Sequence, residues 1–135
     1  MGMVNWGAVI LAALSAFALG GVWYGRLFGA MRRSYAPRVA EARRNQFVTM
    51  ATTLLLMLVS ATMLGHFYAR IGSAVLAAKP WLFAMQATGV ALAFIVPALW
   101  TNALQQRRPL RLAMMDGGYW ISAYLVMGAV FWALS

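Results

Sequence analysis

Residues 47–68 read FVTMATTLLLMLVSATMLGHFY and contain no Asp, Glu, Lys or Arg. A helix needs about 20 mostly apolar residues to cross a hydrocarbon layer about 30 Å thick, at about 1.5 Å per residue. This stretch meets that length, so it predicts a membrane-spanning helix. Its hydroxyls at Thr49, Thr53 and Ser60 are tolerated in a membrane because Ser and Thr can bond back to their own helix.

Three further apolar stretches of similar length lie on either side of this one, at about residues 4–24, 81–100 and 112–134. The first lacks the basic start, the short apolar core and the cleavage site of a signal peptide, so we expect it to be retained as a span. We therefore predict an all-α fold, an integral membrane bundle of four transmembrane helices that forms a single transmembrane domain over residues 1–135.

The composition of the whole chain agrees with a membrane protein. Among 135 residues, 64% are hydrophobic and only 10% are charged, whereas a soluble domain carries about 25% charged residues. This excludes a water-soluble globule, and the apolar content excludes intrinsic disorder. The chain has no Cys, which excludes disulfides, thiolate metal sites and Fe–S clusters.

The charges of the chain are distributed unevenly between the connections. Nine Arg residues lie in the connections 25–46 and 101–111, whereas the connection between the second and third spans has only Arg70 and Lys79. Cytoplasmic loops are enriched in Lys and Arg, so we expect these two connections in the cytoplasm and both termini on the non-cytoplasmic side. The net charge of +9 is then concentrated on one side of the membrane, the cytoplasmic side. A nucleic-acid partner is not expected, because a soluble basic domain or a recognition motif is missing.

The first basic connection is too long for a turn. Leu27, Phe28, Met31 and Tyr35 fall at helical spacing, which predicts a short amphipathic cytoplasmic helix between spans one and two, ending before Pro37. Anionic lipid headgroups are the expected partners of its basic side chains; docking to an acidic protein is the alternative. The residues expected to contact headgroups are Arg32, Arg33, Arg38, Arg43 and Arg44.

Small residues recur at helical spacing in two of the predicted spans. Close approach of helices in lipid depends on such residues, so we expect helix packing at the following positions: Ala8, Ala12, Ala16 and Gly20 in the first span, and Gly118 and Ser122 in the fourth. In the third span, Pro97 removes one backbone hydrogen bond and predicts a kink.

Three segments resemble the DUF1761 family of small four-helix bacterial membrane proteins of unknown function. They are Asn5-Trp6, the stretch Gly20-Gly21-Val22-Trp23-Tyr24 with Leu27-Phe28-Gly29, and residues 101–119, which include Arg108-Pro109-Leu110-Arg111 and Asp116-Gly117-Gly118-Tyr119. The family pattern has an acidic residue where this chain has Gln105 and Gln106. The resemblance implies a helical membrane fold in a bacterial inner membrane, and it implies no catalytic residues.

Asp116 is the most informative single residue, because it is one of only two acids and lies near the start of the fourth predicted span. An ionised carboxylate near hydrocarbon is costly unless it is paired. We expect a structural ion pair or polar cluster in which Asp116 is bound by Arg26, Arg107 or Arg111. A role in ion or proton movement is the alternative.

The chain offers little else for chemistry. His66 could serve as an axial ligand to a haem or chlorin, but it has no second ligand. One His and two acids, with His66 and Asp116 near opposite membrane faces, cannot form a Ser-His-Asp set or a zinc site. We therefore predict no catalytic residue, no metal and no cofactor.

Two functional hypotheses follow from these observations. The first is a non-enzymatic structural or accessory subunit, packed with other membrane subunits or with copies of itself. The second is a small-molecule or lipid binding or transport bundle that acts as an oligomer. A proton-coupled exporter is disfavoured, because the first span has no acidic residue.

Overall fold

The structure is a computed structural model that describes residues 2–35 and 45–135, and every regular element in those ranges is helical. The predicted all-α fold is therefore confirmed for that part of the chain. In chain order the elements are α1 (Trp6–Val22), η1 (Trp23–Leu27), α2 (Gly29–Tyr35), α3 (Gln46–Ile71), α4 (Ser73–Ala78), α5 (Trp81–Val90), η2 (Ala91–Ile95), α6 (Val96–Gln105) and α7 (Leu110–Ala133). The elements η1 and η2 are single wide turns of π-helix. Arg38, Arg43 and Arg44 lie outside the described residues.

Three helical stretches in the described ranges are long and apolar enough to cross a membrane: Trp6–Leu27, Gln46–Ile71 and Trp81–Gln105. They overlap the first three predicted spans and continue past the C-terminal end of each one. The second begins where the Asn45 side chain accepts a hydrogen bond from the backbone N–H of Phe47 at 3.0 Å, which satisfies a free donor of the first turn. It ends at Gly72, whose φ of 89° suits a residue without Cβ.

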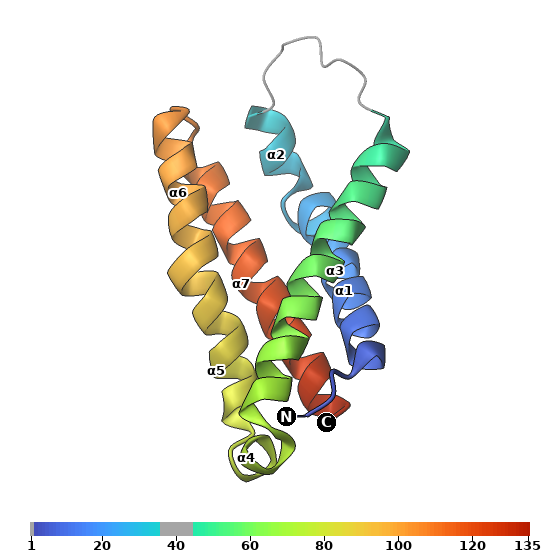
Figure 1. Ribbon diagram of the computed structural model, residues 1–135. Helices are drawn as coiled ribbons and strands as arrows, with labels where there is room; N and C mark the ends of the chain where they lie inside the picture. The colour runs from blue at the N-terminus through green and yellow to red at the C-terminus, as the bar shows by residue number, and fades with distance from the viewer. Residues whose placement is uncertain (1, 36–44) are drawn as a thin grey trace.

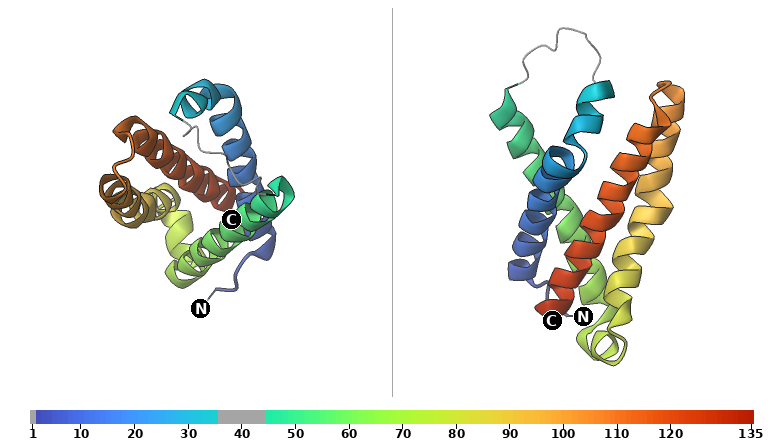
Figure 2. Two further views of the ribbon diagram at one scale, coloured as in Figure 1. Left: turned by 90° about the horizontal axis from the view of Figure 1, so that it is seen from above. Right: turned by 180° about the vertical axis from the view of Figure 1, so that it is seen from behind.

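The fourth predicted span forms the helix α7, but α7 lacks the apolarity of the other three stretches. Asp116, Tyr119 and Tyr124 lower its hydropathy. It lies between α1 on one side and α5 with α6 on the other, as Figure 2 shows. Ten of its residues are buried, more than in any other described helix. A helix that its neighbours cover has little surface facing outward, so its side chains need not all be apolar.

The core lies where α1, α3, α5 and α7 meet, in the half of the molecule that is nearer the chain termini. Ala8, Ala12 and Ala16 of α1 are each 0% exposed and allow α1 to approach both α3 and α7 closely. Met57 and Met127 are among the largest fully buried side chains between these helices. An unbranched Met side chain adapts its shape to the gaps between other side chains.

The other half of the molecule is splayed. The two termini lie together at one end of the bundle, and α2 and the turn between α6 and α7 lie at the opposite end (Figure 1). Towards that end α3 packs on α1 and α6 packs on α7, but α3 and α6 do not pack against each other. The bundle is therefore closed at its terminal end and open at its basic end.

Two local features differ in form from the prediction. Before Pro97 the backbone widens into η2, where the N–H of Val96 donates to the carbonyl of Ala91. The sequence predicted a simple kink at this position, and the structure has a wide turn instead. The wide turn accommodates Pro97, which has no N–H to donate. In the first basic connection, the helix α2 begins only at Gly29, because η1 continues the first span to Leu27 and the backbone bends at Phe28.

Candidate functional site

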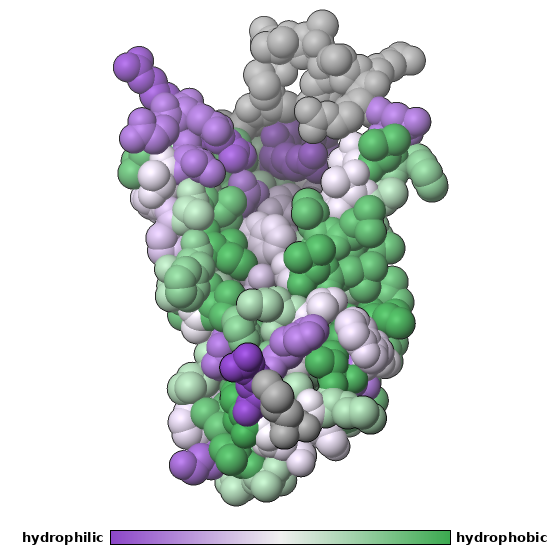
Figure 3. Space-filling model, in the orientation of Figure 1, coloured by the Kyte–Doolittle hydropathy of each residue, from purple (hydrophilic) through white to green (hydrophobic). Residues whose placement is uncertain are grey.

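A cleft of about 1120 Å³ occupies the splayed end of the bundle. Its walls come from α1 with η1, from α3 and from α7, and its rim comes from α2 and the α6–α7 turn. Figure 3 shows a groove between the apolar outer surfaces of α3 and of the α5–α6 arm. The walls are mostly apolar, and Thr49 and Thr53 add two hydroxyls on the α3 side. The apolar wall residues include Phe17, Met50, Met57, Leu112, Met115 and Trp120.

Two glycines of α1 line this cleft and add no side chains to its wall. Gly20 lies against Tyr119, and a Cβ added to Gly20 would lie 3.0 Å from the Tyr119 hydroxyl oxygen. One residue further, a Cβ added to Gly21 would meet nothing within 4 Å, because Gly21 faces the open cleft. Gly20 thus allows α1 to lie close to α7. Gly21, on another face of α1, adds no side chain to the cleft.

Polar contacts join the end of the first span to the start of α7, at the margin of the cleft. The Tyr24 hydroxyl donates to Oδ1 of Asp116 at 2.9 Å. The neighbouring Trp23 donates from Nε1 to the backbone carbonyl of Met115 at 3.1 Å. The π-turn η1 carries both aromatic side chains. These two contacts hold Asp116 in a fixed position with most of its side chain covered, at 17% exposure.

Three arginines stand on the rim of the cleft. Arg108 donates from Nη2 to Oδ2 of Asp116 at 3.4 Å. The guanidinium carbon of Arg32 lies 5.9 Å from the centre of the Tyr24 ring, which is within the range of a cation–π contact. Arg107, the residue before Arg108, also lines the cleft and adopts a backbone φ of 52°.

The position of Arg107 follows from the way α6 ends. The N–H of Arg108 donates to the carbonyl of Ala103, and the N–H of Arg107 donates to the carbonyl of Leu104. This pair of bonds is the Schellman motif, which places the residue after the helix in the left-handed region. Glycine usually occupies that position, and here Arg107 occupies it instead.

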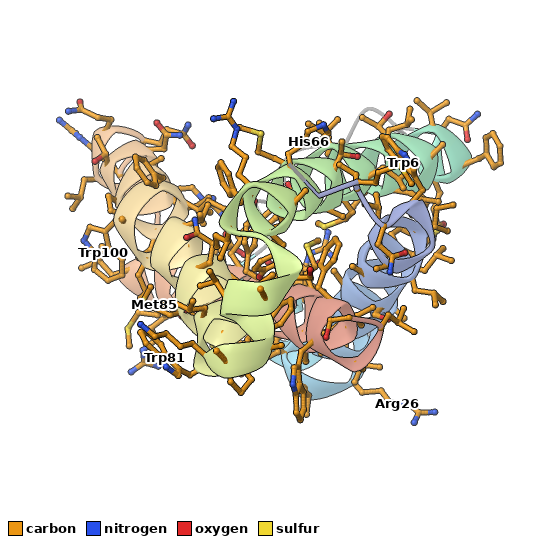
Figure 4. All side chains as sticks on the ribbon, turned by 60° about the horizontal axis from the view of Figure 1, so that its bottom comes forward. Trp6, Arg26, His66, Trp81, Met85 and Trp100 are labelled. Carbon is orange, nitrogen blue, oxygen red and sulfur yellow. The ribbon has the colours of Figure 1, made fainter. Side chains whose placement is uncertain are left out.

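The expected partners of Asp116 differ from the observed one. In the described residues its ion pair is with Arg108 and not with Arg26, Arg107 or Arg111. Arg111 lies five residues before Asp116 in the same helix, on a different face of it. Arg26 points away from the bundle (Figure 4). Sequence reasoning also missed Tyr24 as a partner, since no sequence signal joins two residues 92 positions apart.

Most of the residues expected to pack helices are buried or lie against another helix. Ala8, Ala12 and Ala16 are fully buried, and Ser122 is half-buried. A Cβ added to Gly118 would lie 3.2 Å from the Trp23 ring, so this glycine makes room for that indole. Of the arginines expected at lipid headgroups, Arg32 and Arg33 are exposed on α2.

His66 is placed far from the cleft, beside Trp6 near the terminal end of the bundle (Figure 4). The two rings meet edge to face with 6.3 Å between their centres. Its Nδ1 lies 2.8 Å from the carbonyl of Thr62, which can only accept, so Nδ1 is the protonated nitrogen. Within residues 2–35 and 45–135, no group of three His, Cys, Asp or Glu side chains is arranged to hold a metal ion.

Comparison with known proteins gives a family match. A family model described as "Protein of unknown function (DUF1761)" matches residues 7–132. The chain matches no curated protein and no solved structure. The matched range includes every described residue that lines the cleft.

Proposed function

The chain belongs to the DUF1761 family of unknown function, and we propose that it is an integral membrane protein that binds an amphiphilic molecule in the cleft without transforming it. The cleft carries this proposal. Its volume of about 1120 Å³ exceeds the range of about 300–1,000 Å³ that is usual for small-molecule pockets. Its apolar walls and charged rim suit a ligand with an apolar body and a polar head.

The membrane setting rests on the outer surfaces of the helices. Leu55, Leu56 and Val59 of α3 are each more than half exposed, which suits contact with lipid chains. We propose α7 as the fourth span, because it runs the length of the bundle beside the three apolar stretches. The resemblance to bacterial membrane proteins favours a bacterial inner membrane. The excess of arginine in two connections favours an orientation with both termini outside the cytoplasm.

Binding without catalysis is supported by the residues available. Asp116 is engaged by Tyr24 and Arg108, and His66 lies at the other end of the bundle. A general base beside a nucleophile is the minimum for covalent catalysis, and the cleft lining that the structure describes offers no such pair.

The accessory-subunit hypothesis stays a prediction from the sequence. The exposed apolar faces of α3, α5 and α6 would serve lipid as well as a protein partner. Trp81 and Met85 of α5 and Trp100 of α6 point outward in Figure 4. We rank the ligand-binding proposal above the accessory-subunit hypothesis, because packing against a partner subunit would not require the cleft.

Gly21→Leu tests the binding proposal directly. A leucine side chain at Gly21 enters the cleft without a clash, because nothing lies within 4 Å of its Cβ position. Gly89→Leu is the matched control: Gly89 is also helical and exposed, its Cβ position is also free, and it does not line the cleft. The measurement is native mass spectrometry of protein released from lipid nanodiscs.

We expect the wild type and Gly89→Leu to retain a bound amphiphile and Gly21→Leu to lose it. Equal retention by all three proteins would show that bound molecules sit on the outer surface, and the proposal would be wrong.

A further inference from the structure

The rim of the cleft concentrates positive charge. Arg32 comes from α2, and Arg107 and Arg108 come from the α6–α7 turn, so two distant chain segments meet at this end. Among the described residues that line the cleft, Asp116 is the only acid. The lining therefore carries two more positive than negative charges. A ligand with an anionic group is favoured at this end, and a cationic one is disfavoured.

The arginines retain donors for such an anion. Arg108 shares only one nitrogen with Asp116, over 3.4 Å, and its side chain is 42% exposed. A guanidinium carries five N–H donors and binds phosphate oxygens two at a time. The carboxylate holds Arg108 in place, and Tyr24 takes the other carboxylate oxygen at 2.9 Å. Asp116 thus orients the guanidinium, and within the described residues most donors of Arg108 make no other hydrogen bond.

Arg107 adds a second, independent observation. It is the only described residue other than glycine with a positive φ, at 52°. A residue with a Cβ is strained in this region, and strained backbone gathers at ligand-binding sites. Glycine would close the Schellman turn without that strain. An arginine therefore occupies this position of the rim against the local conformational preference.

The remainder of the cleft indicates that the anion is part of a lipid. Below the rim the walls are mostly apolar and include Phe17, Met57 and Trp120. α3 and α6 do not pack against each other, and the groove opens sideways between them in Figure 3. A free aqueous anion would leave these apolar walls unused, whereas an acyl chain could enter from the membrane and cover them.

We propose that the cleft holds one anionic membrane lipid, with its phosphate bound by Arg32, Arg107 and Arg108 and an acyl chain lying along the apolar walls beside α3. The inference rests on the proposed function, since it names the class of amphiphile that the cleft takes. Arg33, next to Arg32 on α2, is exposed but does not line the cleft and lies outside the proposed site.

The test compares two probes with identical chains, dioleoyl phosphatidylglycerol and dioleoyl phosphatidylcholine. Each is titrated into the full-length protein in neutral detergent, and bound lipid is counted by native mass spectrometry. We expect phosphatidylglycerol to bind more tightly. Arg32→Gln and Arg108→Gln should each weaken it about fivefold, the effect of one basic side chain near an anionic headgroup. Arg33→Gln removes the same charge from the same helix and should leave the affinity unchanged.

Arg107→Gly keeps the test decisive if a charge variant folds poorly. Glycine relieves the positive φ, so the variant should unfold at a higher temperature while it binds phosphatidylglycerol about fivefold more weakly. Greater stability with unchanged affinity would remove Arg107 from the site and overturn the assignment.

The outcomes also separate this inference from the proposed function. If both lipids bind equally, and only Gly21→Leu abolishes binding, then the cleft binds amphiphiles but does not select an anion, and this inference is wrong. If inorganic phosphate displaces the lipid completely at equal concentration, the site takes a free anion and the lipid assignment is overturned. If neither lipid is retained, the proposed function fails as well.

Discussion

At the scale of single residues, Asp116 links two regions that are distant in the sequence. The sequence identified it as a structural acid bound by arginine, and the structure gives it Tyr24 and Arg108 as partners. The sequence could narrow the partners to the basic connections, because those contain nine of the eleven cations. It could not choose among them, since the choice depends on helix rotation and on the turn after α6.

Removal of the Tyr24 hydroxyl tests this link. Tyr24→Phe deletes a hydrogen bond to a carboxylate at 2.9 Å, so we expect the free energy of unfolding to fall by about 1.5–3 kcal/mol. Asp116→Asn should also destabilise the protein. The double variant should lose less than the sum of the two single losses, because both remove the same contact. The measurement is reversible unfolding in mixed detergent micelles.

Tyr124→Phe serves as the control for this cycle. Tyr124 is buried in the same helix as Asp116, and its hydroxyl donates no hydrogen bond within the described residues. We expect its loss to change the free energy of unfolding by less than about 0.5 kcal/mol. Additive effects of Tyr24→Phe and Asp116→Asn would show that these two residues do not interact.

At the scale of elements, α7 is the helix on which the others pack. Most small residues predicted to let helices approach are buried or lie against another helix, but the glycine with the least room for a Cβ is one that the sequence analysis did not single out. A Cβ at Gly128 would lie 2.8 Å from the carbonyl oxygen of Phe83 and 3.0 Å from Cβ of Ala87. Backbone atoms of α5 therefore set the distance between α5 and α7 at this crossing.

Gly128→Ala should be destabilising for that reason. The new methyl group meets backbone that cannot rotate away, so α5 and α7 must separate, at a cost of about 1–3 kcal/mol. Gly117→Ala is the matched control in the same helix, where the nearest atom to the new Cβ is 3.8 Å away. It should be neutral or stabilising, because Ala favours helix by about 1 kcal/mol over Gly. Thermal unfolding of both variants in detergent distinguishes them, and equal midpoints would contradict this account of the crossing.

At the scale of the whole molecule, the termini lie at the opposite end from α2 and the α6–α7 turn (Figure 1). This arrangement agrees with an even number of membrane crossings, and the distribution of arginine predicts which end is cytoplasmic. The wild type has no Cys, so single cysteines report their own accessibility without background.

We expect Met3→Cys and Ser135→Cys to react in intact cells with a maleimide that does not cross membranes. Gln105→Cys, which is exposed at the basic end, should react only after the cells are opened. Labelling of Gln105→Cys in intact cells, with both terminal positions protected, would reverse the predicted orientation. Labelling of one terminus only would mean an odd number of crossings and would exclude α7 as a fourth span.

The sequence by itself determined the all-helical class, the apolar stretches, the segments that carry the arginines and the family. These follow from local properties, since hydropathy, charge and helical spacing are read along one segment at a time. Only the tertiary structure decided that Arg108 meets Asp116, that α7 is the covered helix and that α3 and α6 stay apart around a cleft. Each of these features depends on how helices that are distant in the chain pack together. That packing is set by the shapes of the side chains on both helices, so it leaves no periodic signal in the sequence of either helix alone.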